Sequence, residues 1–392
     1  MFNRLATPKP DPILHIMQLY RDDTRTQKTD LGVGVYKDDT GITPVMRAVK
    51  GAEKKLVDTQ DTKVYTSLVG DPAFHDAMAT LLLDGAVDKA HIAAAASTGG
   101  TGAVRLAMDL IKSANPEATI WISTPTWPNH NLLAKTADLA QRSYRYYDPE
   151  TGGLDRTGMW EDLAQAQPGD IVLLHGCCHN PTGADLTADD WADMAQFLSE
   201  RGLIPFVDIA YQGFGDGLDQ DAAGLRLLAK TQERMIIAAS SAKNFGLYRE
   251  RAGITLILCP EAERAAVQGT MASLNRASIS FPPDHGARVV TTILNSDALR
   301  AEWEAELEEM RNRVNSLRRA LADALRDACG SDRFGFLAEQ RGMFSVLGGT
   351  DEQITRLREE FGVYAVGGGR VNMAGLTLEA VPSVAKAIAQ VL

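Results

Sequence analysis

The chain has 392 residues, a length that fits one large domain or two closely packed domains and excludes a small binding module. Hydrophobic residues make up 45% of the chain and charged residues 23%, the composition of an ordinary globular protein, so we do not expect extensive disorder. The 40 Lys and Arg residues against 51 Asp and Glu residues leave a net charge of −11, which disfavours nucleic-acid phosphates as the main partner.

The cysteines and the chain start indicate where the protein works. Four cysteines, two of them adjacent at Cys177 and Cys178, cannot form a disulfide scaffold and lack the repeated C-x-x-C spacing of a zinc site. The first residues contain no apolar signal core, and no stretch approaches about 18 uninterrupted apolar residues. We therefore expect a cytoplasmic protein with neither a membrane nor a nucleic-acid partner.

From about residue 91 to 260, short apolar runs alternate with segments of helical period. The runs predict buried strands at 119–123, 171–175, 203–208, 235–239 and 254–258. Helical patterns, such as those at 103–113 and 191–198, lie between them. This alternation predicts an α/β layer with a mostly parallel sheet, and ligands of such sheets bind where the strands end.

A long helix is predicted to begin at Ser296-Asp297 and to stop at Gly330. Its apolar residues, from Trp303 to Ala328, recur at alternating spacings of four and three, which fits a stripe packed on a domain core or a coiled-coil seam. We favour the packed stripe because only about three and a half heptads are present and the chain then continues into strands.

The tail predicts a strand at 343–347, a helix around 353–360, a strand near 363–366 and a final helix from about 378. We interpret it as a smaller α+β domain. The predicted division is an N-terminal segment, 1–40, that packs with the small domain, then a large domain, 41–295, and a small domain, 296–392, entered through the long helix.

The first strand-end motif is the glycine-rich stretch 97–102, directly before a helical pattern. Free N–H groups at a helix N-terminus, with glycines that allow close approach, suit a phosphate, although the same pattern is also typical of a plain tight turn. A dinucleotide-binding fold would carry an acidic residue at the end of the next strand, and Trp121–Ser123 carries none. A nucleotide-binding dehydrogenase or regulator is therefore the weaker alternative.

Two further strand ends carry ring and amide side chains. Two prolines hold Trp127 and His130 on a rigid turn, where Trp127 either caps the core or stacks on an aromatic ligand. The strand ending at His175 runs into a turn that contains Asn180. The adjacent Cys-Cys-His cannot converge on one tetrahedral ion, so we predict no metal site.

The remaining strand ends carry a carboxylate and an amine. Asp208 closes an apolar strand, and because burying it alone is costly it must be paired, as a structural cap or as part of a site. Lys243 follows the strand at 235–239 among small residues, and a partly desolvated lysine has a lowered pKa and a nucleophilic amine. Ser240 and Arg251 could hold a dianionic phosphate.

These motifs, in this order, resemble the class I aminotransferases of the aspartate and aromatic amino-acid group, which are pyridoxal-phosphate (PLP) enzymes of fold type I. The resemblance covers nearly the whole chain and is carried by long matches: HGCCHNPTG at 175–183, AYQGF at 210–214, KNFGLY at 243–248 and GRVN at 369–372. Ala242 departs from the Ser or Cys that usually precedes the lysine. The implied fold is a large α/β domain with a mostly parallel, seven-stranded sheet between helices, plus a smaller α+β domain.

The resemblance implies roles for individual residues. Lys243 would bond to PLP and move the substrate proton, Asp208 would keep the pyridine nitrogen protonated, and Tyr211 would hydrogen-bond the phenolic oxygen of the cofactor. The other implied cofactor contacts are Gly100, Thr101, Trp127, Asn180, Ser240, Arg251 and, from the partner subunit, Tyr65. The implied substrate contacts are Gly34, Trp127, Asn180, Arg276 and Arg370, with His130 and His175 supporting Asp208 from behind.

Substrate range follows from the residues implied around the substrate side chain. Arg370 would grip the α-carboxylate in a bidentate fork, and Arg276 would bind a distal carboxylate across a homodimer with shared sites. Strict aspartate enzymes have Asn at the position of Phe281, and they commonly have Asn at the position of Val64 as well. The resemblance therefore predicts transamination of phenylalanine and tyrosine, with tryptophan a further candidate, and of aspartate and glutamate, with 2-oxoglutarate or oxaloacetate as acceptor. The alternative is an aspartate aminotransferase with only minor aromatic activity.

Overall fold

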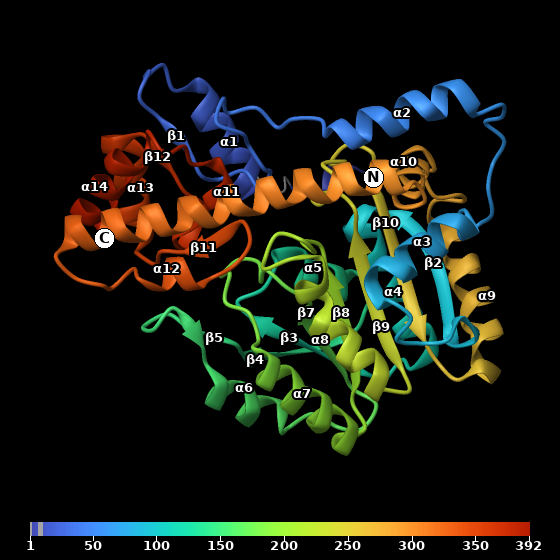
Figure 1. Cartoon of the computed structure of the whole chain (residues 1–392). Helices are drawn as coiled ribbons and strands as arrows, with labels where there is room; N and C mark the ends of the chain where they lie inside the picture. The colour runs from blue at the N-terminus through green and yellow to red at the C-terminus, as the bar shows by residue number, and fades with distance from the viewer. Residues whose placement is uncertain (1, 7–10) are drawn as a thin grey trace.

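A central sheet of seven strands lies between helices, beside a smaller α+β part (Figure 1), in a computed structural model that describes residues 2–6 and 11–392. The strands, in their order across the sheet, are β2 (Ile92–Thr98), β10 (Ala252–Leu258), β9 (Met235–Ser240), β8 (Ile204–Ile209), β7 (Ile171–His175), β3 (Thr119–Thr124) and β4 (Ala140–Arg145). All neighbours are parallel except β10, which runs antiparallel to β2 and β9. The prediction of a mostly parallel sheet is confirmed.

Both faces of this sheet are buried, which explains the nearly continuous apolar runs of its strands. Alternate residues of one strand enter different core clusters: Ala94 and Ala96 of β2 face one, and Ala93 and Ala95 face the other. Edge strand β4 has only Tyr144 buried, so its sequence lacks the apolar run by which strands were predicted.

Helices cover the sheet (Figure 1). They are α2 (Arg47–Thr59), α3 (Pro72–Leu83), α4 (Gly99–Ala114), α5 (Pro128–Thr136), α6 (Arg156–Leu163), α7 (Ala188–Arg201), α8 (Leu218–Thr231), α9 (Glu261–Ser278) and α10 (His285–Leu294). A short hairpin joins β5 (Tyr147–Asp148) to β6 (Gly153–Leu154), and single 3₁₀ turns occupy Phe2–Arg4, Lys89–His91, Gly367–Gly369 and Met373–Gly375. None of the described helices is both long and apolar enough to span a membrane.

The long helix α11 (Asp297–Cys329) begins and ends as predicted, with Gly330 in the left-handed conformation at its end. It packs against α2, α10 and α14 (Val381–Val391) of its own chain, so the packed stripe is correct and the coiled coil is wrong. The stripe stops short of Ala328, which is exposed. Two polar side chains that the pattern did not predict, Glu306 and Arg318, are buried on this helix.

The tail folds as α12 (Phe336–Glu339), β11 (Phe344–Val346), α13 (Asp351–Phe361), β12 (Val363–Tyr364), β13 (Arg370–Asn372) and α14. Strands β11 and β13 pair antiparallel. The chain start joins this part: β1 (Thr29–Asp30), which follows α1 (Pro12–Asp22), pairs with β12, and Tyr364 Oη donates to Asp23 at 2.6 Å. We propose on these contacts the division into residues 1–40, 41–295 and 296–392.

Candidate active site

A cleft opens where the parallel strands end. Strand register places His175 beside Asp208 and Asp208 beside Ala238, so side chains far apart in sequence meet at one sheet edge. The cleft encloses about 550 Å³ of atom-free space, open mouth included. Its lining brings together most predicted site residues: Gly100, Thr101, Trp127, His175, Asn180, Asp208, Tyr211, Ser240, Lys243 and Arg251, together with Cys177, Ala210 and Ala242.

Lys243 presents a desolvated amine to this cleft. Its Nζ lies 5.1 Å from the centroid of the Tyr211 ring. Burial lowers the pKa of Lys243, the nearby Arg251 lowers it further, and Asp208 opposes both. A larger share of neutral amine at pH 7 makes Lys243 a nucleophile and a proton acceptor.

Asp208 is held by a chain of hydrogen-bonding side chains. His130 Nε2 lies 2.9 Å from Asp208 Oδ2, and Thr126 Oγ1 lies 2.8 Å from His130 Nδ1 and 3.1 Å from His175 Nε2. With His130 donating to Asp208 and accepting from Thr126, the Thr126 hydroxyl must in turn accept from His175. Burial, helped by His130, lowers the pKa of His175 to about 3, so this ring is neutral at pH 7.

The first turn of α4 forms an anion cradle with Ser240 and Arg251. Gly99 has φ +70°, and a Cβ there would lie 2.6 Å from Arg251 Nη2. A Cβ on Gly100 would lie 3.1 Å from Ser240 Cβ. The first turn contains no acidic residue, so its free N–H groups, a hydroxyl and a guanidinium surround a space suited to a phosphate.

Five buried side-chain atoms have no hydrogen-bond partner within the described part of the chain, and two of them, Asn180 Oδ1 and Arg370 Nε, belong to predicted site residues. Such atoms are rare in folded proteins, and at a cleft they are available to bind a ligand. Arg370 Nη2 donates to Gly32 O at 2.8 Å, and the guanidinium carbon lies 4.7 Å from the Phe344 ring centroid. The guanidinium is therefore oriented, with the Nε donor still free.

Gly34 and Tyr211 also contact Phe344. A Cβ on Gly34 would lie 2.9 Å from Phe344 Cζ, so only glycine allows this close approach of the loop. The Tyr211 ring meets Phe344 edge to face, with centroids 6.0 Å apart. Burial raises the pKa of Tyr211, so its hydroxyl keeps its proton and can donate it.

Tyr65 and Arg276 do not line this cleft. Tyr65 stacks on Phe281 with centroids 4.6 Å apart, and Arg276 Nη1 donates to Ser280 Oγ at 3.1 Å. Val64 and Tyr65 are 79% and 78% exposed. These residues form an outward-facing patch on the single chain.

The adjacent cysteines form a compact buried cluster with an acidic residue. Cys177, Cys178 and Asp221 place one potential ligand atom each within 4.8 Å of the others, whereas His179 is engaged by Thr182. The Cys178 thiol and burial raise the pKa of Cys177, and burial raises that of Cys178 to about 12, so both thiols stay protonated.

Sequence reasoning missed two residues that orient this site. Thr126 bridges His130 and His175, and its only sequence signal was a hydroxyl four positions before His130. Asn372 Nδ2 donates to the carbonyls of Val33 at 2.5 Å and Val35 at 2.8 Å, and so holds the loop that contains Gly34. Its signal was the two-residue spacing from Arg370, which places both side chains on one face of β13.

Comparisons with known proteins identify the family of the chain. The family model described as aminotransferase class I and II matches residues 26–388. The aromatic-amino-acid aminotransferase of Paracoccus denitrificans is 53% identical over 392 residues, and the aspartate aminotransferase of Escherichia coli (strain K12) is 44% identical over 398, each covering 100% of both chains. Among solved structures, an aromatic amino acid aminotransferase with 3-indolebutyric acid has TM-score 0.97 at 52% identity, covering 100% of both chains. The aromatic-amino-acid aminotransferase of Burkholderia pseudomallei, covalently bound to pyridoxal phosphate, has TM-score 0.97 at 40% identity and covers 100% of this chain and 99% of that one.

Proposed function

The chain belongs to the aminotransferase class I and II family, and from that premise we propose that it transfers amino groups from aromatic and dicarboxylic amino acids to 2-oxoglutarate or oxaloacetate, with PLP as cofactor. The observation that carries this proposal is the joint placement of a desolvated lysine amine, a carboxylate and an anion cradle in one cleft. The named relatives include aromatic-amino-acid and aspartate aminotransferases, which supports both substrate classes.

The residues of the cleft fit PLP group by group. The cradle of α4, Ser240 and Arg251 suits the phosphate, Lys243 suits the aldehyde, and Asp208 suits the ring nitrogen. Asn180 and Tyr211 suit the phenolic oxygen, because the Tyr211 hydroxyl and the Asn180 amide nitrogen are both donors that line the cleft. When bound, PLP supplies a conjugated ring that accepts the electron pair left on the substrate α-carbon.

The chain's own residues would orient the substrate and move its proton. Arg370 would hold the α-carboxylate with its free Nε donor and a terminal nitrogen, as a planar fork. Lys243 Nζ would take the proton from the α-carbon and return it on the product side. Asp208, held by His130, would stabilise positive charge at the ring nitrogen throughout.

We propose a homodimer in which the patch of Val64, Tyr65, Arg276 and Phe281 completes the partner's cleft. Its support is that Val64, Tyr65 and Arg276 are exposed on the single chain, with Phe281 half-buried under Tyr65, although the resemblance assigns Tyr65 and Arg276 to a site. Apolar Val64 and Phe281 suit an aromatic ring, whereas Arg276 suits a distal carboxylate. One pocket would then serve both substrate classes, with Arg276 turned aside for a ring.

We also propose a cytoplasmic location. The support is chemical: the chain carries four cysteines, and the structure describes all four as unpaired thiols. Persistent thiols are typical of a reducing compartment. The acidic balance of −11 agrees with small-molecule substrates as its main partners.

Steady-state kinetics with phenylalanine, tyrosine and aspartate, each paired with 2-oxoglutarate, tests the proposal. We expect measurable turnover with all three. The Arg276→Leu variant should lose a few powers of ten in kcat/KM for aspartate, because breaking a desolvated carboxylate pair costs about 3–5 kcal/mol, and should lose much less for phenylalanine. Arg276→Lys, which keeps the charge without the planar fork, should lie between. Equal losses for both substrates, or a wild type inactive on both aromatic amino acids, would contradict dual specificity.

A further inference from the structure

Arg318, in the middle of α11, is a buried cation with no carboxylate within salt-bridge distance among the described residues, although Asp185 lies near enough to raise its pKa. Its side chain is only 1% exposed. Its guanidinium donates to the carbonyls of Leu337, Arg341, Gly342 and Phe344 and to Ser345 Oγ, at 2.5–3.2 Å. Burial lowers the pKa of Arg318 to about 10, so the group remains charged at neutral pH.

The shape of the acceptors requires arginine at this position. A buried cation is costly unless its donors are satisfied, and here all the recorded acceptors are neutral oxygens. Arginine offers five N–H groups in a rigid fork, whereas lysine offers three and a neutral amide only two. Any substitution at Arg318 therefore leaves carbonyl groups of the Arg341–Ser345 segment without a donor.

On one side, the Arg341–Ser345 segment packs on the turn that carries Asn180. Arg341 N donates to Gly183 O at 2.8 Å. A Cβ on Gly183 would lie 2.5 Å from Phe344 O, which is too close for a carbon atom. A Cβ on Gly342 would overlap Cys178 Cβ. The segment and the turn thus fit together without spare space.

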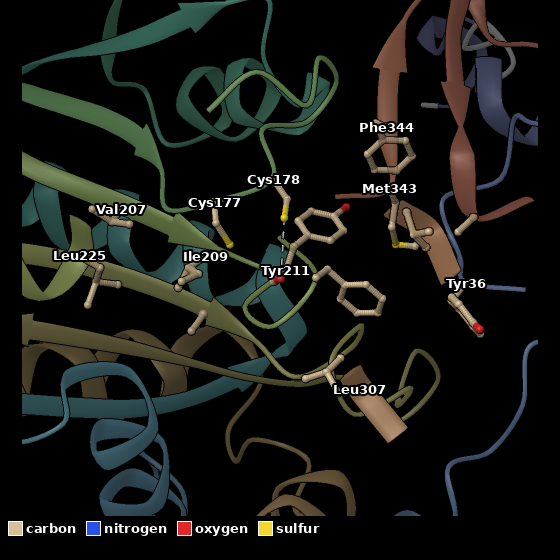
Figure 2. Packing of buried hydrophobic residues seen from close by; sticks show 14 of the residues in the cluster. Tyr36, Cys177, Cys178, Val207, Ile209, Tyr211, Leu225, Leu307, Met343 and Phe344 are labelled. Carbon is tan, nitrogen blue, oxygen red and sulfur yellow. Dashed lines mark hydrogen bonds between the residues drawn. The ribbon is translucent and has the colours of Figure 1, made fainter. Parts of the chain in front are cut away.

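On the other side, the segment forms the wall behind Arg370. Phe344 pairs with Asn372 across β11 and β13, and its ring faces the Arg370 guanidinium at 4.7 Å. Figure 2 shows Phe344 and Met343 on the β11 side of the core, with Tyr211 and Cys178 opposite them. A shift of the segment would move the ring against which the guanidinium is oriented.

A chain of hydrogen bonds also leads from Arg318 to the β5–β6 hairpin. Ser345 Oγ accepts from Arg318 at 2.7 Å and donates to Gln340 Oε1 at 2.6 Å. Gln340 Nε2 donates to Gly152 O, on the β5–β6 hairpin, at 2.8 Å. Each group donates in the same direction, away from the cation, and aligned hydrogen bonds of this kind reinforce one another.

We propose that Arg318 is a positioning residue for substrate binding: it fixes the Arg341–Ser345 segment so that Phe344 holds Arg370 ready for the substrate α-carboxylate. The inference rests on the proposed function, which makes Arg370 the carboxylate ligand. Arg318 does not line the cleft, so it acts through Phe344. Its loss should therefore weaken carboxylate binding more than cofactor binding or turnover at saturation.

The test compares Arg318→Gln and Arg318→Lys with the control Arg319→Gln. Arg319 is the next residue on the same helix, is exposed, and hydrogen-bonds only Ser316 among the described residues, so its replacement removes the same charge without touching the segment. Calorimetry gives the Kd of succinate, a dicarboxylate that cannot react, on the PLP-loaded protein. Kinetics gives KM and kcat for aspartate and phenylalanine, and titration of the cofactor-free protein gives half-saturation by PLP.

For Arg318→Gln we expect the succinate Kd and both KM values to rise about tenfold or more, with kcat and PLP half-saturation within about threefold of wild type. Arg318→Lys should recover part of the loss, and Arg319→Gln should match wild type. Phe344→Leu should reproduce the rise, and adding Arg318→Gln to it should raise the Kd little further, because the two act through one contact.

Unchanged succinate binding in Arg318→Gln would overturn the inference, as would equal losses of succinate affinity, PLP affinity and kcat, which indicate general damage. If Arg318→Gln does not fold, the same comparison with Arg318→Lys decides. A wild type that neither binds succinate nor transaminates would instead overturn the proposed function.

Discussion

Burial gives the ionisable side chains of the cleft distinct protonation states at neutral pH. It lowers the pKa of Lys243 and favours a neutral amine, lowers that of His175 and keeps the ring neutral, and raises that of Tyr211 and keeps the hydroxyl protonated. Lys243, which would be charged in water, and His175, which would be partly charged, are therefore brought toward their neutral forms before a substrate arrives, while Tyr211 remains a hydrogen-bond donor.

Replacing Lys243 by Ala should leave a folded protein without transaminase turnover, because no other amine among the described residues lines the cleft. PLP should still bind through the anion cradle, but the yellow absorption of covalently bound PLP should be absent. Circular dichroism, absorption and activity check this together. A variant with wild-type turnover would show that Lys243 is not the reacting amine.

His179 should make the stability of the protein depend on pH. It is fully buried, stacks on Tyr146 and packs at a tilt against His175, and burial holds its pKa well below the ordinary value. Below about pH 6.5 the unfolded chain binds a proton at His179 that the folded protein does not bind. The free energy of unfolding therefore decreases by up to about 1.4 kcal/mol for each unit by which the pH is lowered.

The variant His179→Phe keeps a flat ring but cannot titrate, and it loses the hydrogen bonds to Thr182 and Ser123. It should be less stable than wild type at pH 7, and the difference should shrink as the pH falls toward about 5, since only the wild type loses this contribution. Urea unfolding of both proteins across this range measures the difference. His130 and His175 are common to both proteins, so a difference that stays constant would contradict the role of His179.

Residues that carry chemistry could be recognised from sequence because they follow strand ends, as Asp208 and Lys243 do. Residues that only orient others could not. Arg318 lies on a helix face where charge normally means solvent, and Thr126 resembles any turn threonine; their partners are separated by up to 27 and 49 residues. Only the folded chain brings such donors and acceptors together.

At the scale of elements, the approach of β10 to the start of α4 shapes the anion cradle. Gly253 lies opposite Ser97 on one neighbouring strand and Ser240 on the other. A Cβ on Gly253 would overlap the backbone of Gly99. Because Gly253 has no side chain, α4 can begin directly against β10.

Gly253→Ala should therefore displace the α4 N-terminus and raise the PLP concentration for half-saturation by about tenfold, corresponding to about 1.4 kcal/mol. Gly269→Ala on α9, where a Cβ would meet nothing within 4 Å, is the matched control and should match wild type. Fluorescence titration of the cofactor-free proteins measures both. Equal PLP affinities in the two variants would count against the cradle.

Elements with a continuous apolar run were predictable: β7 was placed at 171–175, and β3, β8 and β9 within one or two residues. Short strand β13 was missed because only three residues pair, and β4 because its residues are mostly polar. These strands form because of the strands they pair with, which are distant in sequence, so the local sequence pattern does not reveal them.

At the scale of the whole molecule, the proposed shared sites make a prediction about mixed dimers. Lys243→Ala chains and Arg276→Ala chains should each lack aspartate transamination. In a mixed dimer, the Arg276→Ala chain still supplies Lys243 and its partner supplies Arg276, so one intact site forms. Mixing the two variants under conditions of subunit exchange should restore part of the activity. No recovery despite proven exchange would indicate sites contained within one chain.

The central claim, that one cleft containing Lys243 transfers amino groups from both aromatic and dicarboxylic amino acids, is tested most directly by a half-reaction. Purified PLP-loaded protein is mixed with excess phenylalanine or aspartate, without any oxo-acid acceptor, and the oxo acid released is quantified. The account predicts one equivalent of phenylpyruvate or oxaloacetate per chain, with the amino group retained by the protein until 2-oxoglutarate is added. Release from aspartate alone, or no stoichiometric release from either amino acid, would contradict it.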